Sequence, residues 1–266
     1  MTAPGTGERL GAVPNLDADE VRALLTRSRA AQPDWGRRSI RERAELLNTF
    51  RRMLADRADE AARLSSRESG KMVFEGLVGD VLPTLDLARF YGSRVGRVMA
   101  PRSERSWIIT KKGWVEREPY GVMGVISPWN FPILNPMRVV MAALVTGNTV
   151  VLKPSEHSPM SAVLMRQLAL EAGFPEDVFL VATGDGETGR ALVDGAVDKI
   201  SFTGSVPTGR AVAEAAARRL VPVTLELGGK NAMVVLADAD LDRAVNLGIQ
   251  GAYWNAGQIC IAVERV

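Results

Sequence analysis

Two apolar runs, Val122-Met-Gly-Val-Ile-Ser127 and Thr149-Val-Val-Leu-Lys153, flank a stretch from Pro132 to Val145 that has a helical pattern and is followed by Gly147. A strand, a helix and a second strand in this order form a crossover between parallel strands. Strands that are covered on both faces are continuously apolar, as these two runs nearly are. This stretch therefore predicts a parallel sheet with helices on both sides.

The same alternation extends along the rest of the chain. Ser158 and Pro159 are typical of a helix start, and Gly173 is typical of a helix end. Further strands are expected at residues 178–182, 199–203, 223–227 and 232–236, and further helices at residues 187–193, 207–219 and 240–254. Together these elements predict an α/β fold with a doubly wound parallel sheet.

The first hundred residues are expected to be mainly helical. Asp17 is a candidate N-cap for a helix that ends near Pro33, and Ser39 with Glu42 forms a capping-box pattern. A further helical stretch is expected at residues 73–91, where two glycines and a proline are weak points. This region carries no obvious chemistry.

Residues 104–119 are expected to protrude from the sheet as a β-hairpin. The segment Trp107–Glu118 is typical of two short strands that turn near Lys112-Gly113. Its alternating, partly apolar faces fit either a hairpin that stays in solvent or an edge that pairs with another subunit. The sequence leaves both interpretations open.

The composition is that of an ordinary soluble globular protein, with 46% apolar and 24% charged residues among 266. A net charge of +2 gives no reason to expect a nucleic acid as a partner. No apolar run reaches the ~18 residues of a membrane span, and residues 1–16, expected to be a disordered tail, lack the features of a signal peptide. The single cysteine excludes an internal disulfide, so we expect a cytoplasmic protein.

Polar and glycine-rich segments follow the predicted strands, where doubly wound sheets bind their ligands. The glycines from Gly204 to Gly209 precede a helix whose free N–H groups could hold a pyrophosphate, although glycines also simply end strands. Lys153 could bond ribose hydroxyls or be solvated. Glu156 would repel a 2′-phosphate, which favours NAD over NADP.

A carboxylate and a lone thiol suggest covalent chemistry. Glu226 lies in Glu226-Leu-Gly-Gly-Lys230, and Cys260 is the only cysteine; together they could serve as a base and a nucleophile. Cys260 could equally be an apolar core residue. Asn130 could donate to an oxyanion or cap the helix expected to begin at Pro132. His157, the only histidine, is expected at the surface.

Five motifs occur in one chain in a characteristic order and spacing. They are Pro128-Trp-Asn-Phe-Pro132, Lys153-Pro-Ser-Glu156, Phe202-Thr-Gly-Ser205, Glu226-Leu-Gly-Gly-Lys230 and Gly257-Gln-Ile-Cys260. This set resembles the aldehyde dehydrogenase superfamily, with some similarity to its succinate-semialdehyde dehydrogenase-like branch. The resemblance extends over nearly all of the chain from about residue 17. It implies a Rossmann-like NAD(P)-binding domain.

The resemblance implies a role for each matching residue. Cys260 would be the nucleophile, Glu226 the general base, and Asn130 with the backbone N–H of Cys260 the oxyanion hole. The cofactor, NAD with NADP as the second option, would be bound by Ile126, Ser127, Pro128, Trp129, Lys153, Ser155, Glu156, Gly186, Gly189, Phe202, Thr203, Gly204, Ser205, Thr208, Leu227 and Gly228. No metal is implied.

The implied reaction is oxidation of an aldehyde to a carboxylic acid. The similarity to the succinate-semialdehyde dehydrogenase-like branch makes a semialdehyde, such as succinate semialdehyde, one candidate substrate. Residues 17–227 would form the cofactor-binding domain, with hairpin 104–119 as an oligomerisation element, and residues 228–266 the beginning of a catalytic domain. Members of the superfamily are close to twice as long and are expected to be homo-oligomers. Two hypotheses follow: an NAD(P)-dependent dehydrogenase seen as its first half, or an inactive cofactor-binding or interaction module that needs a second chain.

Overall fold

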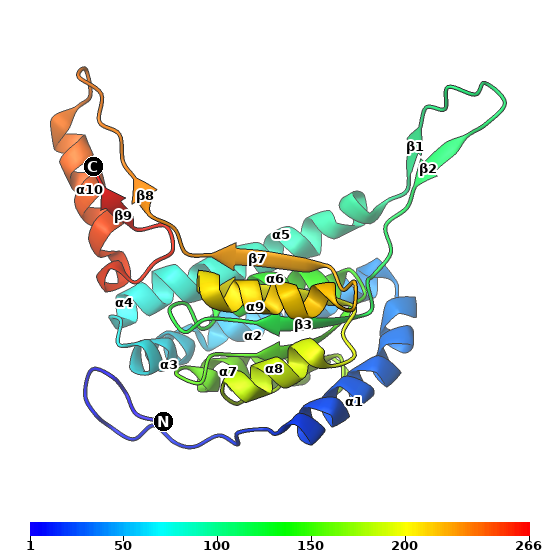
Figure 1. The fold of residues 1–266 in the computed structure, drawn as a ribbon, viewed down its shortest axis with the longest axis horizontal. Coiled ribbons are helices and arrows are strands. Elements are labelled where there is room, and N and C mark those ends of the chain that lie inside the picture. The colour runs from blue at the N-terminus through cyan, green and yellow to red at the C-terminus, as the bar shows by residue number, and fades with distance from the viewer.

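The fold is organised around a five-stranded parallel sheet with strand order β5-β4-β3-β6-β7 in a computed structural model that describes all residues from 1 to 266 (Figure 1). The strands are β3 (Val122–Ile126), β4 (Thr149–Lys153), β5 (Phe179–Val181), β6 (Lys199–Gly204) and β7 (Val223–Leu227). The chain adds β4 and β5 on one side of β3 and then β6 and β7 on the other. The predicted doubly wound sheet is confirmed, with its winding reversed between β3 and β6.

Helices cover both faces of the sheet, because successive residues of each strand point to opposite sides. In β4, Val150 and Leu152 belong to one buried apolar cluster, whereas Val151 belongs to the other. The helices in contact with the strands are α1 (Ala18–Arg37), α6 (Leu134–Val145), α7 (Pro159–Glu171), α8 (Gly186–Asp194) and α9 (Val206–Ala217). The continuously apolar runs therefore reflect burial on both faces.

Helix α1 (Ala18–Arg37) begins as expected, with Asp17 as the N-cap of a capping box completed by Glu20. The predicted end near Pro33 is wrong, since the helix contains this proline and continues for one more turn. That last turn is held by Trp35, whose buried ring donates from Nε1 to the carbonyl of Leu144 at 3.0 Å. Tertiary packing thus outweighs the helix-breaking tendency of proline.

The other N-terminal helices are α2 (Ile40–Asp56), α3 (Ala58–Ser69), α4 (Val73–Gly76), a π-helical turn (Leu77–Val81) and α5 (Leu82–Met99). The capping box of Ser39 and Glu42 is confirmed at the start of α2. The helical stretch expected at 73–91 is divided by the π turn and reaches Met99. Gly76 is required there, because a Cβ atom would lie 2.6 Å from the carbonyl oxygen of Ala62.

The hairpin consists of β1 (Arg102–Glu104) and β2 (Gly113–Val115), paired antiparallel with Arg102 opposite Val115. The expected first strand from Trp107 is wrong, as is the turn near Lys112-Gly113. This register places residues 105–112 in the connecting loop, where Trp107 is 92% exposed. Figure 1 shows the hairpin projecting well beyond the sheet.

Residues 1–16 follow a defined path, which differs from the disordered tail expected from the sequence. Met1 donates from its amino group to the carbonyl of Gly11 at 2.8 Å, and Thr2 forms a β-bridge with Arg9. Further along, Leu16 donates its backbone N–H to the carbonyl of Thr183 at 2.9 Å. The segment is therefore attached to the body of the molecule beside the start of α8.

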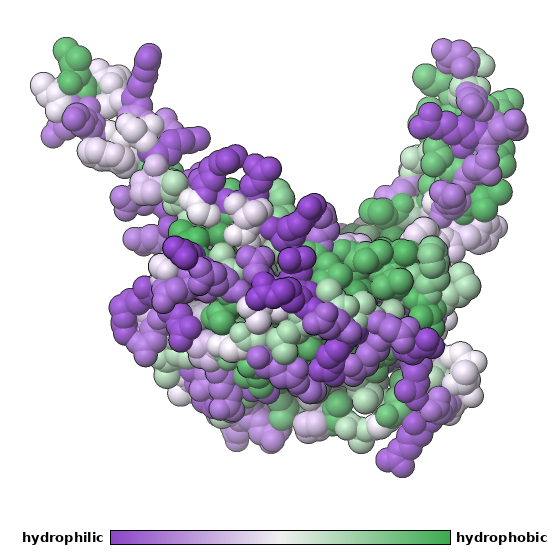
Figure 2. Space-filling view, turned by 180° about the vertical axis from the view of Figure 1, so that it is seen from behind, coloured by the Kyte–Doolittle hydropathy of each residue, from purple (hydrophilic) through white to green (hydrophobic).

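Residues 228–266, called the C-terminal arm below, leave the sheet after β7. The arm contains β8 (Asn231–Ala232), α10 (Leu241–Tyr253), a 3₁₀ turn (Trp254–Gly257) and β9 (Val263–Arg265), and β8 pairs with β9 rather than with the main sheet. Strand β8 is shorter than the strand expected at 232–236. Helix α10 has no buried residue, and Figure 2 shows apolar side chains on both projecting parts.

None of the helices combines the length and the apolar character that crossing a membrane requires.

Candidate active site

A cavity of about 890 Å³, called the main cavity below, lies at the carboxyl ends of β3, β4 and β6. This volume falls within the ~300–1,000 Å³ typical of ligand pockets. Most of the predicted cofactor-binding residues line it: Ile126, Ser127, Pro128, Trp129, Lys153, Ser155, Glu156, Gly186, Gly189, Phe202, Thr203, Gly204, Ser205 and Thr208. Segments far apart in the sequence therefore meet in one hollow, as the parallel topology predicts.

Lys153 and Glu156 form an ion pair at the edge of this cavity. The Lys153 ammonium donates to Oε2 of Glu156 at 3.1 Å, and the lysine side chain is only 6% exposed. Partial burial raises the pKa of Glu156, but its own backbone N–H and the Lys153 ammonium outweigh this effect and leave the pKa below its usual value. The cavity therefore presents an ionised carboxylate next to a fixed ammonium group.

Helix α9 begins at the cavity wall. Ser205 is its N-cap and accepts from the backbone N–H of Thr208, while its hydroxyl lies 2.9 Å from that of Thr208. Gly204 precedes it without a side chain, and a Cβ there would lie 2.6 Å from Cζ of Phe202. Pro207 has no N–H, so the backbone N–H of Val206 is the free donor of the first helical turn. Together with the positive end of the helix dipole it suits an anionic group.

Other cavity residues were not found from the sequence. They are His157, Asp185, Glu187, Arg190, Val193, Asp194, Ala211, Val212, Glu214, Ala215 and Arg218. Most of them lie on α8 and α9. The sequence pattern of each helix does not show which of its sides faces the cavity. His157 is exposed, as expected, but it also borders the cavity.

The cavity fits a dinucleotide in its chemistry. Gly186 would admit a Cβ with no atom within 4 Å, so the wall is open at the start of α8. Lys153 offers donors for hydroxyl groups, the start of α9 offers the helix dipole and the N–H of Val206 for a diphosphate, and Phe202 with Val212 supplies apolar surface. The predicted residues Leu227 and Gly228 lie outside the cavity lining.

Asn130 and the segment before Cys260 are in direct contact. The side-chain Nδ2 of Asn130 donates to the carbonyl of Gln258 at 2.8 Å, and Oδ1 accepts from Nδ2 of Asn135 at 3.2 Å. The second bond fixes which end of the amide faces the cysteine segment. Asn130 therefore has a second side-chain N–H that is free to donate beside the segment that contains Gln258.

Cys260 is exposed and lies in what we call the cysteine loop, residues 255–262. Its carbonyl accepts from Nδ2 of Asn231 at 2.8 Å. Its backbone N–H makes no hydrogen bond within the chain, which leaves that donor available to an oxyanion. The alternative of a buried apolar cysteine is wrong, because Cys260 is exposed.

The alternative interpretation of Asn130 as a helix cap is also wrong. Helix α6 has no side-chain cap from Asn130; its backbone N–H groups at Ile133 and Leu134 instead donate to Oδ1 of Asp80, at 3.1 and 2.8 Å. Asp80 comes from the π turn, so the sequence near α6 gives no signal of it. The Asn130 side chain is thereby left to the cysteine loop.

Glu226 lies near the carboxyl end of β7, opposite Thr203 of β6, and is exposed. No hydrogen bond joins its carboxylate to Cys260 or to Asn130. The structure thus brings Asn130 and the cysteine loop together, and places Glu226 at the same edge of the sheet without a contact to either. The catalytic roles of all three residues stay predictions.

Comparison with known proteins identifies the family. The chain matches the aldehyde dehydrogenase family over residues 1–266 and belongs to it. The superfamily predicted from the five motifs is confirmed.

Several relatives are similar over nearly the whole chain. It is 38% identical over 267 residues to a 4,4'-diapolycopene aldehyde oxidase of Methylomonas sp, covering 99% of this chain and 50% of that protein. It is 36% identical to the succinate-semialdehyde dehydrogenase [NADP(+)] GabD of Escherichia coli, covering 100% and 55% respectively. The chain thus spans about half the length of the curated relatives it matches.

The fold is similar to solved structures of the same family. The NAD+ complex of an aldehyde dehydrogenase from Bacillus cereus superposes with a TM-score of 0.94 at 34% identity, covering 98% of this chain and 54% of that one. The α/β architecture with a parallel sheet is therefore the one found in aldehyde dehydrogenases.

Proposed function

We propose that the protein to which this chain belongs oxidises an aldehyde to a carboxylic acid with NAD or NADP. The single observation that carries the proposal is the 2.8 Å bond from Asn130 to Gln258, two positions before the only cysteine. It joins a polar donor that follows β3, beside the main cavity, to the segment that carries Cys260. Family membership supplies the class of chemistry.

Cys260 would act as the nucleophile. Its thiolate attacks the aldehyde carbon, the sulfur–carbon bond forms, and the carbonyl electron pair moves to oxygen. The second N–H of Asn130 and the backbone N–H of Cys260 would hold that oxyanion. One such donor is typically worth about 10²–10³ in rate.

The main cavity would hold the dinucleotide. Lys153 and Glu156 would bind the ribose of the adenosine, and the start of α9 at Ser205 would bind the diphosphate. The bound nicotinamide would supply the hydride acceptor for the adduct, which leaves a thioester on Cys260. Trp129 would separate the cofactor from the substrate.

Glu226 would act as the general base for the second half of the reaction. The carboxylate takes a proton from water, the water oxygen attacks the thioester carbon, and the thiolate of Cys260 leaves. Glu226 is exposed, and a Cβ at the nearby Gly228 would meet no atom within 4 Å, so water has access to this edge of the sheet.

The substrate class is an aldehyde, and we propose a semialdehyde such as succinate semialdehyde. Two relatives are named succinate-semialdehyde dehydrogenases, while others are named for 4,4'-diapolycopene aldehyde and for 3,6-anhydro-alpha-L-galactose. For the cofactor we favour NAD, because the ionised Glu156 would repel a 2′-phosphate, although those two relatives are named for NADP.

We also propose a cellular compartment for the protein and a role for the hairpin. We propose a cytoplasmic protein in which the hairpin pairs with another subunit, because its loop exposes Trp107 at 92% and Ile109 at 100%. The alternative of an inactive cofactor-binding module has less support, since the relatives are named as oxidising enzymes.

The test is NADH or NADPH formation from succinate semialdehyde and from a simple aliphatic aldehyde, with Cys260→Ala as the control. Turnover that is lost in Cys260→Ala supports the proposal and excludes the inactive module. Binding of NAD without any turnover contradicts the proposed activity for this chain and leaves the module as the better description.

A further inference from the structure

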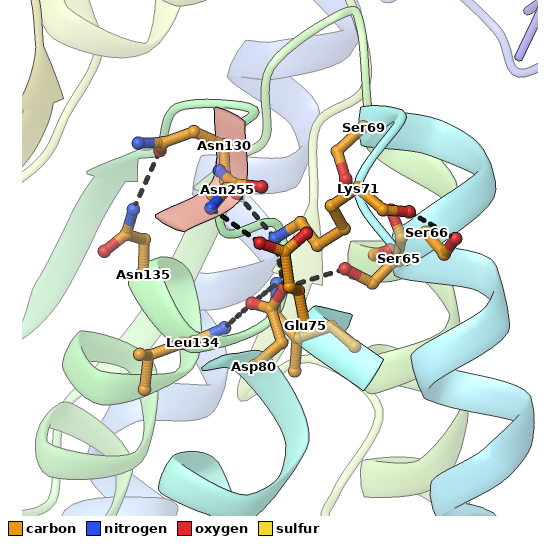
Figure 3. A network of polar contacts seen from close by, with 12 residues as sticks. Ser65, Ser66, Ser69, Lys71, Glu75, Asp80, Asn130, Leu134, Asn135 and Asn255 are labelled. Carbon is orange, nitrogen blue, oxygen red and sulfur yellow. Dashed lines mark hydrogen bonds and ion pairs between the residues drawn. The ribbon is translucent and has the colours of Figure 1, made fainter. Parts of the chain in front are cut away.

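A buried ion pair lies directly beneath Asn130. The ammonium of Lys71 is 2.8 Å from Oδ2 of Asp80, and both side chains are 0% exposed (Figure 3). Lys71 comes from the link between α3 and α4, and Asp80 comes from the π turn. Neither residue belongs to the proposed catalytic or cofactor-binding set.

The ammonium of Lys71 and both carboxylate oxygens of Asp80 have hydrogen-bond partners within the chain. Oδ2 of Asp80 also accepts from the hydroxyl of Ser65 at 2.7 Å, and Oδ1 accepts the two backbone N–H groups at the start of α6. Lys71 donates to Asp80 and to the carbonyl of Asn130 at 2.7 Å, and its ammonium lies 4.2 Å from the ring centre of Phe131. The lysine therefore has one fixed direction, toward the Asn130 peptide.

The carbonyl of Asn130 is the point at which this pair meets the cysteine loop. It accepts from Lys71 at 2.7 Å and from Nδ2 of Asn255 at 3.2 Å. Nδ2 of Asn255 also lies 3.3 Å from the carbonyl of Gln258, the same oxygen to which the side chain of Asn130 donates. The lysine, the oxyanion donor and the loop before Cys260 thus form one continuous set of hydrogen bonds.

The cysteine loop needs such support because of its backbone. Asn255, Ala256 and Gly257 have φ values of 52°, 55° and 75° in succession. The left-handed region is unfavourable for residues with a side chain and persists when the surroundings hold it. The backbone N–H of Asn255 donates to Oε1 of Glu75 at 2.7 Å, so α4 holds the loop from a second side.

The π turn packs closely against Phe131 and Trp254. A Cβ at Gly79 of the π turn would lie 3.0 Å from Cε1 of Phe131 and 3.7 Å from Nε1 of Trp254. The π turn therefore touches both the residue after Asn130 and the residue before Asn255. Short π turns inside helices often lie at functional sites.

Stability does not account for the pair. A buried ion pair is on average no more stabilising than well-packed apolar residues of the same volume, because both charges lose their hydration. What an apolar pair cannot supply is a directional bond to the Asn130 carbonyl. We propose that Lys71, held by Asp80, is a positioning residue that fixes the Asn130 peptide and the cysteine loop relative to each other; its effect on catalysis rests on the proposed function.

The first test needs no catalytic activity and follows backbone hydrogen exchange of the 266-residue chain. In Lys71→Met, exchange should rise at least tenfold in peptides that cover residues 128–134 and 254–262, and should stay unchanged in β3 and β4. The matched control is Lys199→Met, which removes a partly buried lysine 5.1 Å from the ring of Tyr120, at the amino end of β6. It should leave both peptides unchanged.

Lys71→Met leaves the carboxylate of Asp80 buried without its counter-charge, so it could fail to fold. The double variant Lys71→Met/Asp80→Asn removes both charges and keeps a side-chain oxygen for the start of α6. It should regain thermal stability while the two peptides still exchange faster than in the wild type. Return of wild-type exchange together with stability would overturn the proposal, because the pair would then serve stability alone.

The second test measures kcat and KM for aldehyde oxidation. We expect the double variant to lose at least tenfold in kcat with little change in the KM for NAD. Wild-type kcat in a variant with increased loop exchange would overturn the role in positioning. Absence of turnover in the wild type would contradict the proposed function instead, and the exchange result would then decide on the positioning role by itself.

Discussion

Replacing Asn130 by alanine should slow carbonyl chemistry while leaving the cysteine itself reactive. The structure gives the Asn130 amide two N–H groups, one of which donates to Gln258 at 2.8 Å while the other is free. Loss of one oxyanion donor typically costs about 2.7–4 kcal/mol of transition-state stabilisation. We therefore expect kcat for aldehyde oxidation to fall about 10²–10³-fold.

Two reactions of the single thiol separate this effect from simple misfolding. Acyl transfer from an activated ester to Cys260 passes through a tetrahedral oxyanion and needs no cofactor, so it should slow to a similar extent in Asn130→Ala. Alkylation of Cys260 by iodoacetamide forms no oxyanion, so its rate should remain within about threefold of the wild type.

The control variant is Asn135→Ala, which removes the bond to Oδ1 of Asn130 at 3.2 Å, while the bond from Nδ2 of Asn130 to the carbonyl of Gln258 still orients the amide. It should lose much less activity than Asn130→Ala, with a stability cost of about 0.5–1.5 kcal/mol for one hydrogen bond. Equal losses of acyl transfer and alkylation in Asn130→Ala would refute the reasoning, since Asn130 would then act on the thiol rather than on an oxyanion.

Two further predictions concern carboxylates. Glu156→Gln should raise the preference for NADP over NAD at least about fivefold, because a unit charge about 4 Å from another contributes roughly 1–4 kcal/mol near a protein surface; the ratio of kcat/KM for the two cofactors measures it, and an unchanged ratio would mean that the carboxylate does not face the 2′ position. Glu68 is buried and accepts the backbone N–H groups of Met160 and Ser161 at 2.6 and 2.8 Å. Burial raises the pKa of Glu68 above its usual 4.5, in spite of these bonds and that from the Ser161 hydroxyl. The folded chain then binds this proton more tightly than the unfolded chain, so the contribution of Glu68 to stability is fully present below pH 4.5 and is lost as the pH rises through the raised pKa. Urea unfolding as a function of pH should show this decline in the wild type and lose it in Glu68→Gln, and an identical slope in both would contradict the assignment to Glu68.

Much of the sheet could be predicted because its strands carry a strong local signal. Val150, Val151 and Leu152 are all fully buried, so an unbroken apolar run is the direct consequence of helices on both faces. Gly173 marks the end of α7 for an equally local reason, since its φ of 93° suits glycine. These features depend on neighbours in sequence, which are visible without a structure.

The end of α1 and the strands of the hairpin differ from the sequence prediction, because both depend on residues that are distant in the sequence. The end of α1 was predicted at Pro33, whereas the bond from Trp35 to the carbonyl of Leu144 extends the helix. The strands of the hairpin were predicted inside the segment 107–118, but the pairing of Arg102 with Val115 makes most of that segment a loop. In both cases contacts across the fold outweigh local propensity.

The candidate site shows the same division. The segments at the ends of β3, β4 and β6 could be predicted to converge, because parallel strands bring their carboxyl ends to one edge. The contribution of Lys71 and Asp80 could not be predicted, since each lies in a short irregular piece of backbone at least fifty residues before Asn130. A buried charge pair has no periodic pattern, and its partner is set by tertiary structure alone.

The most direct test of the central claim is to trap the acyl group on Cys260. The Glu226→Gln variant would be incubated with succinate semialdehyde and NAD, digested, and examined by mass spectrometry of the peptide that contains Cys260. We predict a succinyl thioester on this cysteine that accumulates to about one equivalent per chain. One NADH should form for each thioester, and the thioester should be absent when NAD is omitted. An unmodified Cys260 in a variant that still produces NADH would contradict the proposal that this thiol carries the reaction.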